Sequence, residues 1–111
     1  MRKVLVVDDE FLVRVGIKSF LNWEENGYTI IGEAADGKQA LEIMERELPD
    51  VVLTDLKMDG MDGFELIQVS RKRFPTVQFV VLSSFEDGEN VKRAMKLGAA
   101  DYIFKLTSKP E

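Results

Sequence analysis

Short apolar runs alternate along the chain with longer amphipathic segments. Residues 4–7 (VLVV) are apolar without interruption and rich in β-branched side chains, and two aspartates stop the run. This pattern is typical of a central parallel strand that is buried on both faces. Further strands are predicted over residues 28–33, 51–54, 78–82 and 101–105. The run at 28–33 is more mixed, which indicates a strand nearer the edge of the sheet.

Apolar residues at helical spacing predict a helix after each of the first four strands. The first helix contains the apolar residues from Phe11 to Leu21 and ends at residues 22–23. The second begins at the turn formed by Asp36 and Gly37 and ends at Pro49.

The last two predicted helices carry clear end signals. Asp62 and Glu65 have the spacing of a capping box at the start of the third helix, and Pro75 stops that helix. The fourth helix includes residues 91–95, and Gly98 occupies the position just after it, where glycine ends many helices. Five strands joined by four helices through right-handed crossovers predict an α/β fold with a doubly wound parallel sheet.

Polar side chains follow the ends of several predicted strands. Asp8 and Asp9 follow the first strand, Asp55 the third and Ser83 the fourth, while Lys105 closes the fifth. The carboxyl ends of parallel strands meet at one edge of the sheet, so these side chains are expected to converge there. Two carboxylates about 4 Å apart repel by roughly 4 kcal/mol at an effective dielectric near 20, which favours a bound divalent cation.

Hard oxygen ligands of this kind suit Mg²⁺. Asp9 and Asp55 are the predicted direct ligands, with Asp8 acting through water. The Asp55 carboxylate can also attack a phosphoryl group and become an aspartyl phosphate. Lys105 would then neutralise part of the added charge, and the Ser83 hydroxyl would donate to a phosphoryl oxygen.

Composition narrows the possible chemistry. The 111 residues, 45% of them hydrophobic, suit one globular domain, and the absence of cysteine and histidine excludes thiolate and imidazole chemistry. The 20 acidic and 15 basic residues give a charge of −5 and a pI near 4.8, which argues against direct nucleic-acid binding. No apolar segment is long enough for a signal peptide or a membrane span, so a cytoplasmic protein is expected.

Four motifs in this order resemble the response-regulator receiver domains of two-component systems over essentially the whole chain. They are residues 7–10 (VDDE), 53–58 (LTDLKM), 82–84 (LSS) and Lys105. The resemblance implies a flavodoxin-like strand order 2-1-3-4-5, Mg²⁺ as cofactor, a sensor histidine kinase as partner and no enzymatic turnover.

The resemblance also implies a role for individual residues. Asp55 would be the phosphoacceptor, Asp8 and Asp9 the acid pair, and the backbone carbonyl of Lys57 would complete the metal site. Ser83 and Lys105 would bind the phosphoryl group, and Tyr102 matches the aromatic residue of the switch. Phosphorylation would draw Ser83 inward, turn Tyr102 and change the surface of the fourth helix and fifth strand.

Residues 22–28 and 32–34 resemble the subfamily fused to AraC-type DNA-binding domains. The chain is therefore expected to be a C-terminally truncated receiver domain, residues 1–111, whose effector domain is absent. The final helix of the fold is also expected to be missing, which would bare an apolar strip beside the first helix and favour a homodimer. Two residues depart from the family pattern, because Asp59 and Leu106 stand where proline is usual.

Several alternatives remain open from the residues. Ser83 could cap the fourth helix, and Tyr102 could simply pack its ring on the core. A Mg²⁺-dependent phosphohydrolase would also use an aspartate nucleophile, although usually after the first strand. A nucleotide-binding module is disfavoured because no glycine-rich phosphate loop is present. A docking module that no longer responds to phosphorylation is the third alternative.

Overall fold

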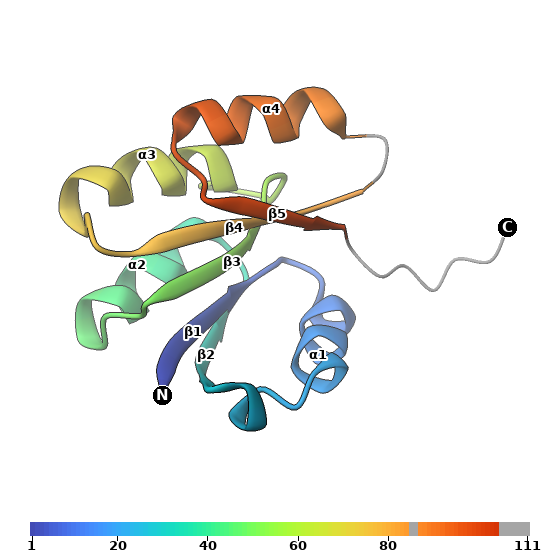
Figure 1. Cartoon of the computed structure of the whole chain (residues 1–111). Helices are drawn as coiled ribbons and strands as arrows, with labels where there is room; N and C mark the ends of the chain where they lie inside the picture. Colours follow the sequence, from blue (N-terminus) through green and yellow to red (C-terminus); the bar gives the residue numbers. More distant parts are fainter. Residues whose placement is uncertain (85–86, 105–111) are drawn as a thin grey trace, which may run out of the picture.

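The computed structural model describes residues 1–84 and 87–104, which form a five-stranded parallel sheet flanked by helices (Figure 1). The strands are β1 (Arg2–Val7), β2 (Tyr28–Ala34), β3 (Val51–Asp55), β4 (Gln78–Ser83) and β5 (Asp101–Phe104). The helices are α1 (Phe11–Phe20), α2 (Gly37–Arg46), α3 (Gly63–Arg73) and α4 (Gly88–Leu97), with a 3₁₀ turn, η1, at Glu24–Asn26. The strand order is β2-β1-β3-β4-β5, as predicted, and β2 lies at an edge.

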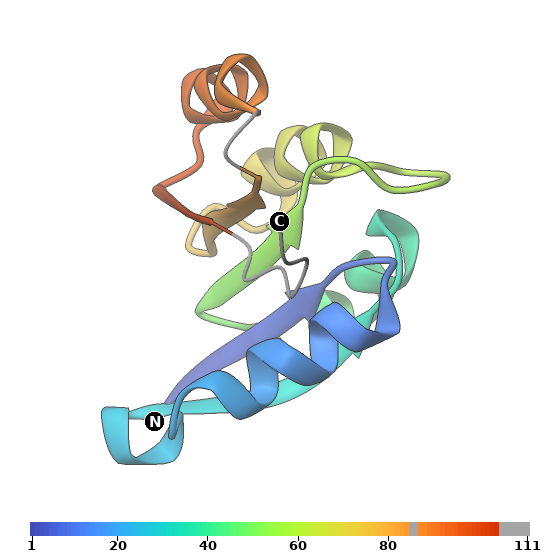
Figure 2. The same ribbon diagram turned by 90° about the vertical axis from the view of Figure 1, so that its right-hand side faces the viewer.

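The side chains of β1 alternate between the two faces of the sheet. Leu5 and Val7 belong to the larger apolar core, which α2, α3 and α4 cover. Val4 and Val6 belong to a smaller core on the opposite face, where α1 lies (Figures 1 and 2). All four side chains are buried, which explains why the sequence of this strand is continuously apolar.

Helix α1 is shorter than the predicted helix, which extended to residues 22–23. It ends at Phe20, and the backbone of Leu21 is already extended. The indole N–H of Trp23 donates to the carbonyl oxygen of Ile17 at 3.1 Å, so a side chain satisfies one of the carbonyl groups left at the helix end. The carbonyl of Trp23 then accepts from the Tyr28 amide at 2.9 Å, which starts β2.

The predicted signals at two helix ends are confirmed. The Asp62 carboxylate accepts from the Glu65 amide at 3.0 Å, and the Glu65 carboxylate accepts from the Asp62 amide at 3.2 Å, which is the reciprocal capping box of α3. Gly98 ends α4 with a φ of 117°, a conformation that L side chains rarely adopt.

The face that carries α1 is only partly covered by the described residues. Helix α1 lies over β1 and β2, whereas no described helix lies over β4 and β5 on this face (Figure 2). Large apolar side chains of α1 and β5 are exposed, among them Leu12, Phe20 and Ile103. Within residues 1–84 and 87–104, no helix is long and apolar enough to cross a membrane.

The first residue of α3, Gly63, fits so closely against the end of β3 that a methyl group cannot be added there. A Cβ atom on Gly63 would lie 2.3 Å from the carbonyl oxygen of Asp55 and 2.9 Å from Cα of Leu56. Gly63→Ala is therefore expected to lower the free energy of unfolding by about 2 kcal/mol or more, measured by urea denaturation.

Gly88 is the matched control, because it is the first residue of α4 and a Cβ atom there would meet no described atom within 4 Å. Gly88→Ala is expected to leave stability unchanged or to raise it by about 0.4–1 kcal/mol, since alanine restricts the unfolded chain. Equal stabilities for the two variants would contradict the close approach at Gly63.

Candidate metal centre

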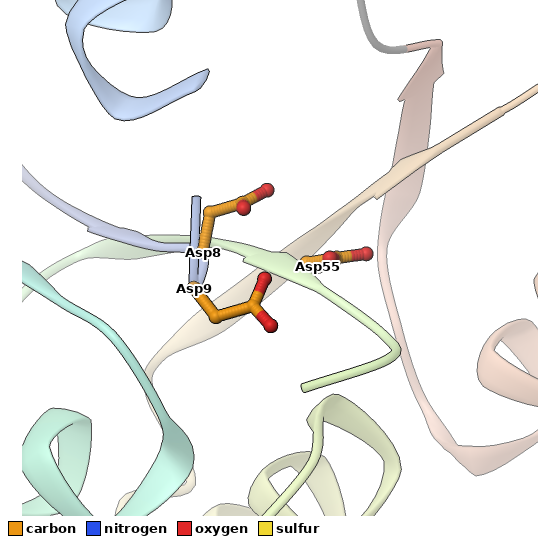
Figure 3. A group of neighbouring side chains, drawn as sticks. All are labelled: Asp8, Asp9 and Asp55. Carbon is orange, nitrogen blue, oxygen red and sulfur yellow. The ribbon is translucent and has the colours of Figure 1, made fainter. Parts of the chain in front are cut away.

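Three aspartates meet at the carboxyl edge of the sheet. Asp8 and Asp9 directly follow β1, and Asp55 is the last residue of β3. Strands β1 and β3 are neighbours, with Val7 opposite Thr54, so the residues that follow in each strand reach the same edge. One carboxylate oxygen from each aspartate lies within 4.8 Å of the others (Figure 3). The predicted convergence of these three side chains is therefore observed.

Backbone amides orient two of these carboxylates. Oδ1 of Asp8 accepts from the Glu10 amide at 2.9 Å, and Oδ1 of Asp55 accepts from the Leu56 amide at 2.8 Å. Asp8 is fully buried and Asp55 is 8% exposed, whereas Asp9 is exposed. The backbone amides that follow β1 and β3 thus fix the orientation of the two buried carboxylates.

The donor set fits a hard divalent cation. Three carboxylates offer only oxygen ligands, and clustering three negative charges with two of them buried is costly without positive charge nearby. Mg²⁺ is commonly held by one or two carboxylates together with water and phosphate oxygens. The arrangement of Asp8, Asp9 and Asp55 could therefore bind a metal of this class.

Ser83 places a buried hydroxyl on the neighbouring strand. It ends β4, one residue beyond Leu82, which pairs with Asp55. Its side chain is 1% exposed, and its Oγ makes no hydrogen bond to the described residues. The alternative role of capping α4 is wrong, because the N-cap of α4 is Asp87 and Ser83 lies within the strand. A buried donor of this kind at the sheet edge suits an oxygen-rich ligand.

The other predicted site residues differ in how they are placed. Lys105 and its peptide bond to Leu106 lie outside the described residues. The side chain of Lys57 is 73% exposed, and its ammonium nitrogen lies 3.8 Å from the Asp87 carboxylate at the start of α4. Tyr102 is 42% exposed on β5, and its ring packs edge-on against that of Phe104, with 5.5 Å between the ring centroids.

A hydrogen-bonded network beside the acid pair was not anticipated from the sequence. Arg14 of α1 donates from Nη1 to the backbone oxygen of Asp8 at 2.5 Å and from Nε to Oε1 of Glu33 on β2 at 2.8 Å. Lys18 forms an ion pair with the other oxygen of Glu33. The sequence signal for this network was the four-residue spacing of Arg14 and Lys18, the two charged residues of α1.

Comparisons with known proteins place the chain in one family. Residues 4–111 match the sequence model of the family described as the response regulator receiver domain. The chain is 43% identical over 105 residues to YesN of Bacillus subtilis, an uncharacterized transcriptional regulatory protein, covering 95% of this chain and 28% of YesN. It is 42% identical over 106 residues to the response regulator protein VraR of Staphylococcus epidermidis, covering 96% of this chain and 50% of VraR.

Solved structures of receiver domains have the same fold as this chain. The REC domain of AraT, a response regulator from Geobacillus stearothermophilus, superposes with a TM-score of 0.88 at 35% identity, covering 96% of this chain and 82% of that one. The receiver domain of NtrX from Brucella abortus gives a TM-score of 0.82 at 29% identity, covering 95% and 87% of the two chains.

The five-stranded parallel sheet of this chain is therefore the α/β architecture of the receiver domains with which it superposes. The chain belongs to the response regulator receiver domains of two-component systems. Response regulators act together with histidine kinases and carry output domains, and transcriptional regulators are among the relatives. The chain spans 28% and 50% of the lengths of YesN and VraR.

The network around Glu33 makes fold stability depend on pH. Hydrogen bonds from Lys18 and Arg14 hold the pKa of Glu33 below its ordinary value of 4.5. A lowered pKa in the folded state stabilises the fold at pH values above the unfolded pKa, and this contribution is lost as the pH falls through the folded pKa. Glu33→Gln is expected to lower the free energy of unfolding by about 0.5–1 kcal/mol at pH 7, because the pair is partly solvated.

The difference in unfolding free energy between wild type and Glu33→Gln should shrink as the pH drops below 4.5, because the wild-type carboxylate then becomes protonated. Urea denaturation at a series of pH values measures it. Glu45→Gln is the control, because the ion pair of Glu45 with Arg73 is more exposed and should contribute less. A deficit for Glu33→Gln that does not change with pH would contradict the assignment.

Proposed function

We propose that this receiver domain accepts a phosphoryl group on Asp55 in a Mg²⁺-dependent reaction, from the phosphohistidine of a sensor histidine kinase. One observation carries the proposal. The buried Asp55 carboxylate shares one edge of the sheet with two further carboxylates and with the buried Ser83 hydroxyl. Acidic groups together with a hydroxyl donor match the needs of a metal-assisted phosphoryl transfer.

The Asp55 carboxylate supplies the nucleophile. One of its oxygens forms the new bond to phosphorus while the bond between phosphorus and the kinase histidine nitrogen breaks. The electron pair of that bond stays on the imidazole, which takes up a proton from solvent. The Leu56 amide donates a hydrogen bond to Oδ1 of Asp55. This bond limits rotation of the carboxylate and favours one direction of attack on phosphorus.

Asp9, Asp55 and the backbone carbonyl of Lys57 are the proposed direct metal ligands, and Asp8 would act through water. When bound, Mg²⁺ withdraws charge from the phosphoryl oxygens. Ser83 would donate its hydroxyl hydrogen to a phosphoryl oxygen, and Lys105 would balance the added negative charge. Asp55 would carry a single phosphoryl group and release it slowly, so the domain is a phosphoacceptor and not an enzyme with external substrate turnover.

The proposed switch couples Ser83 to the face formed by α4 and β5. Movement of Ser83 toward the phosphoryl group would shift the start of the segment that leads to α4. Tyr102 borders a cavity of about 620 Å³ that Val91 and Met95 of α4 also line. Room beside the ring supports a change in the orientation of Tyr102, which would alter the surface presented to partners.

We further propose that the domain is part of a longer cytoplasmic regulator with a C-terminal DNA-binding effector domain of the AraC type. The support is the limited share of YesN that the chain spans, together with the AraC-subfamily resemblance of residues 22–28. The exposed apolar residues of α1 and β5 are compatible with a homodimer of the receiver domain. In this arrangement the acidic receiver domain does not itself contact DNA.

Acetyl phosphate with Mg²⁺ tests the phosphoacceptor directly. Intact mass should show one added phosphoryl group on the wild-type chain, and none on Asp55→Asn or on wild type with a chelator. Steady hydrolysis of external phosphate esters would instead favour a phosphohydrolase. If a longer chain that includes the following segment also takes up no phosphoryl group, the phosphorylation-independent docking module is the better description.

The variant Ser83→Ala tests whether Ser83 is needed for the switch without disturbing the fold. Removal of a buried hydroxyl without a described partner should leave stability unchanged or slightly higher, because no hydrogen bond to the described residues is lost. The same variant should still be phosphorylated, but the NMR shift changes that phosphorylation causes in α4 and β5 should be much smaller than in wild type. Wild-type shift changes in the variant would refute the role of Ser83.

A further inference from the structure

We propose that Arg14 is a positioning residue for the metal centre, because it fixes the turn that carries Asp8 and Asp9 against the edge strand β2. The proposal deepens the proposed function and rests on it where metal binding is concerned. Arg14 reaches the acid pair through the backbone of Asp8, so it would act through the ligands and not as a ligand.

Both backbone polar groups of Asp8 are hydrogen-bonded, the amide to β2 and the carbonyl to Arg14 of α1. The Asp8 amide donates to the carbonyl oxygen of Ala34 at 3.0 Å, and the Asp8 carbonyl accepts from Nη1 of Arg14 at 2.5 Å. Arg14 is in turn bonded to Glu33, the residue before Ala34. The turn is thus tied to β2 twice, once directly and once through the guanidinium.

The start of α1 is joined to the turn through the Glu10 amide, which donates to Oδ1 of Asp8, and not through a side-chain cap. Glu10 occupies the N-cap position but makes no side-chain capping hydrogen bond. Helix entry is usually fixed by such a bond. Arg14, one turn into the helix, instead connects α1 to the residue that leaves β1.

A bulge in β2 allows this contact. Val4 pairs with Ile30 but Leu5 pairs with Gly32, so Ile31 is an extra residue in β2. The residue opposite Val6 is therefore Glu33, and it shares the face of Val6, which is the face of α1. Strict alternation from Ile30 would have put glycine on that face and turned Glu33 toward α2.

The charges of the network favour a positioning effect over a direct electrostatic one. Glu33 neutralises Arg14 through a contact of 2.8 Å, and the Arg14 side chain is only 15% exposed. A guanidinium is planar and offers separate donors for the two acceptors, which a lysine ammonium cannot match in the same geometry. Metal ligands need support of this kind, since their outer partners often set affinity.

The experiment compares Arg14→Gln with Lys18→Gln, which also loses a contact to Glu33 but has no described hydrogen bond to Asp8. The first readout is hydrogen exchange of the Glu10 amide without metal, since this amide bonds to Oδ1 of Asp8. Exchange should be about 5-fold faster in Arg14→Gln than in wild type and unchanged in Lys18→Gln.

The second readout is Mg²⁺ affinity by calorimetry. The affinity should fall roughly 10-fold in Arg14→Gln and stay near that of wild type in Lys18→Gln. If Arg14→Gln does not fold, Arg14→Lys is measured in its place, and it should also show faster exchange and weaker binding than wild type.

The outcomes separate this inference from the proposed function. Wild-type exchange and affinity in the Arg14 variant, or equal losses in the Arg14 and Lys18 variants, would overturn the positioning role. A wild-type chain that binds no Mg²⁺, while Arg14→Gln still exchanges faster at Glu10, would overturn the metal-dependent function but leave the role of Arg14 in holding the turn intact.

Discussion

The register between β1 and β3 is the constraint on which the site depends. Val7 lies opposite Thr54, so the chain leaves both strands at the same height and brings Asp8 and Asp55 together. A slip of one residue would exchange the two faces of β1 and move apolar side chains out of their cores. Burial of Val4 to Val7 on both faces therefore holds the carboxylates together against their mutual repulsion.

Much of the fold could be predicted because its signals are local. Uninterrupted apolar runs marked the buried strands, and the capping box at Asp62 marked the start of α3. The aspartates could be placed at one edge because parallel strands must end there. The site was predictable to the extent that it follows directly from strand ends.

The remaining features depend on tertiary contacts that no local pattern encodes. At the early end of α1, the Trp23 indole donates to the carbonyl oxygen of Ile17, a contact between residues six apart. The role of Glu33 depends on the bulge at Ile31, which reverses the alternation of β2. The close approach of Gly63 to Asp55 joins two elements separated by a loop. A hydrophobic pattern read along the sequence does not reveal any of these contacts. The role of Lys105, which lies outside the described residues, stays a prediction.

The place of Trp23 has a practical consequence for spectroscopy. It is the single tryptophan of the chain, it packs edge-on against Tyr28 with 6.2 Å between ring centroids, and it lies where β2 begins, at the opposite end of the sheet from Asp55. Its emission would therefore follow the integrity of the domain while remaining remote from ligands at the acidic edge. A ligand that changes this emission must act through the protein and not by direct contact with the indole.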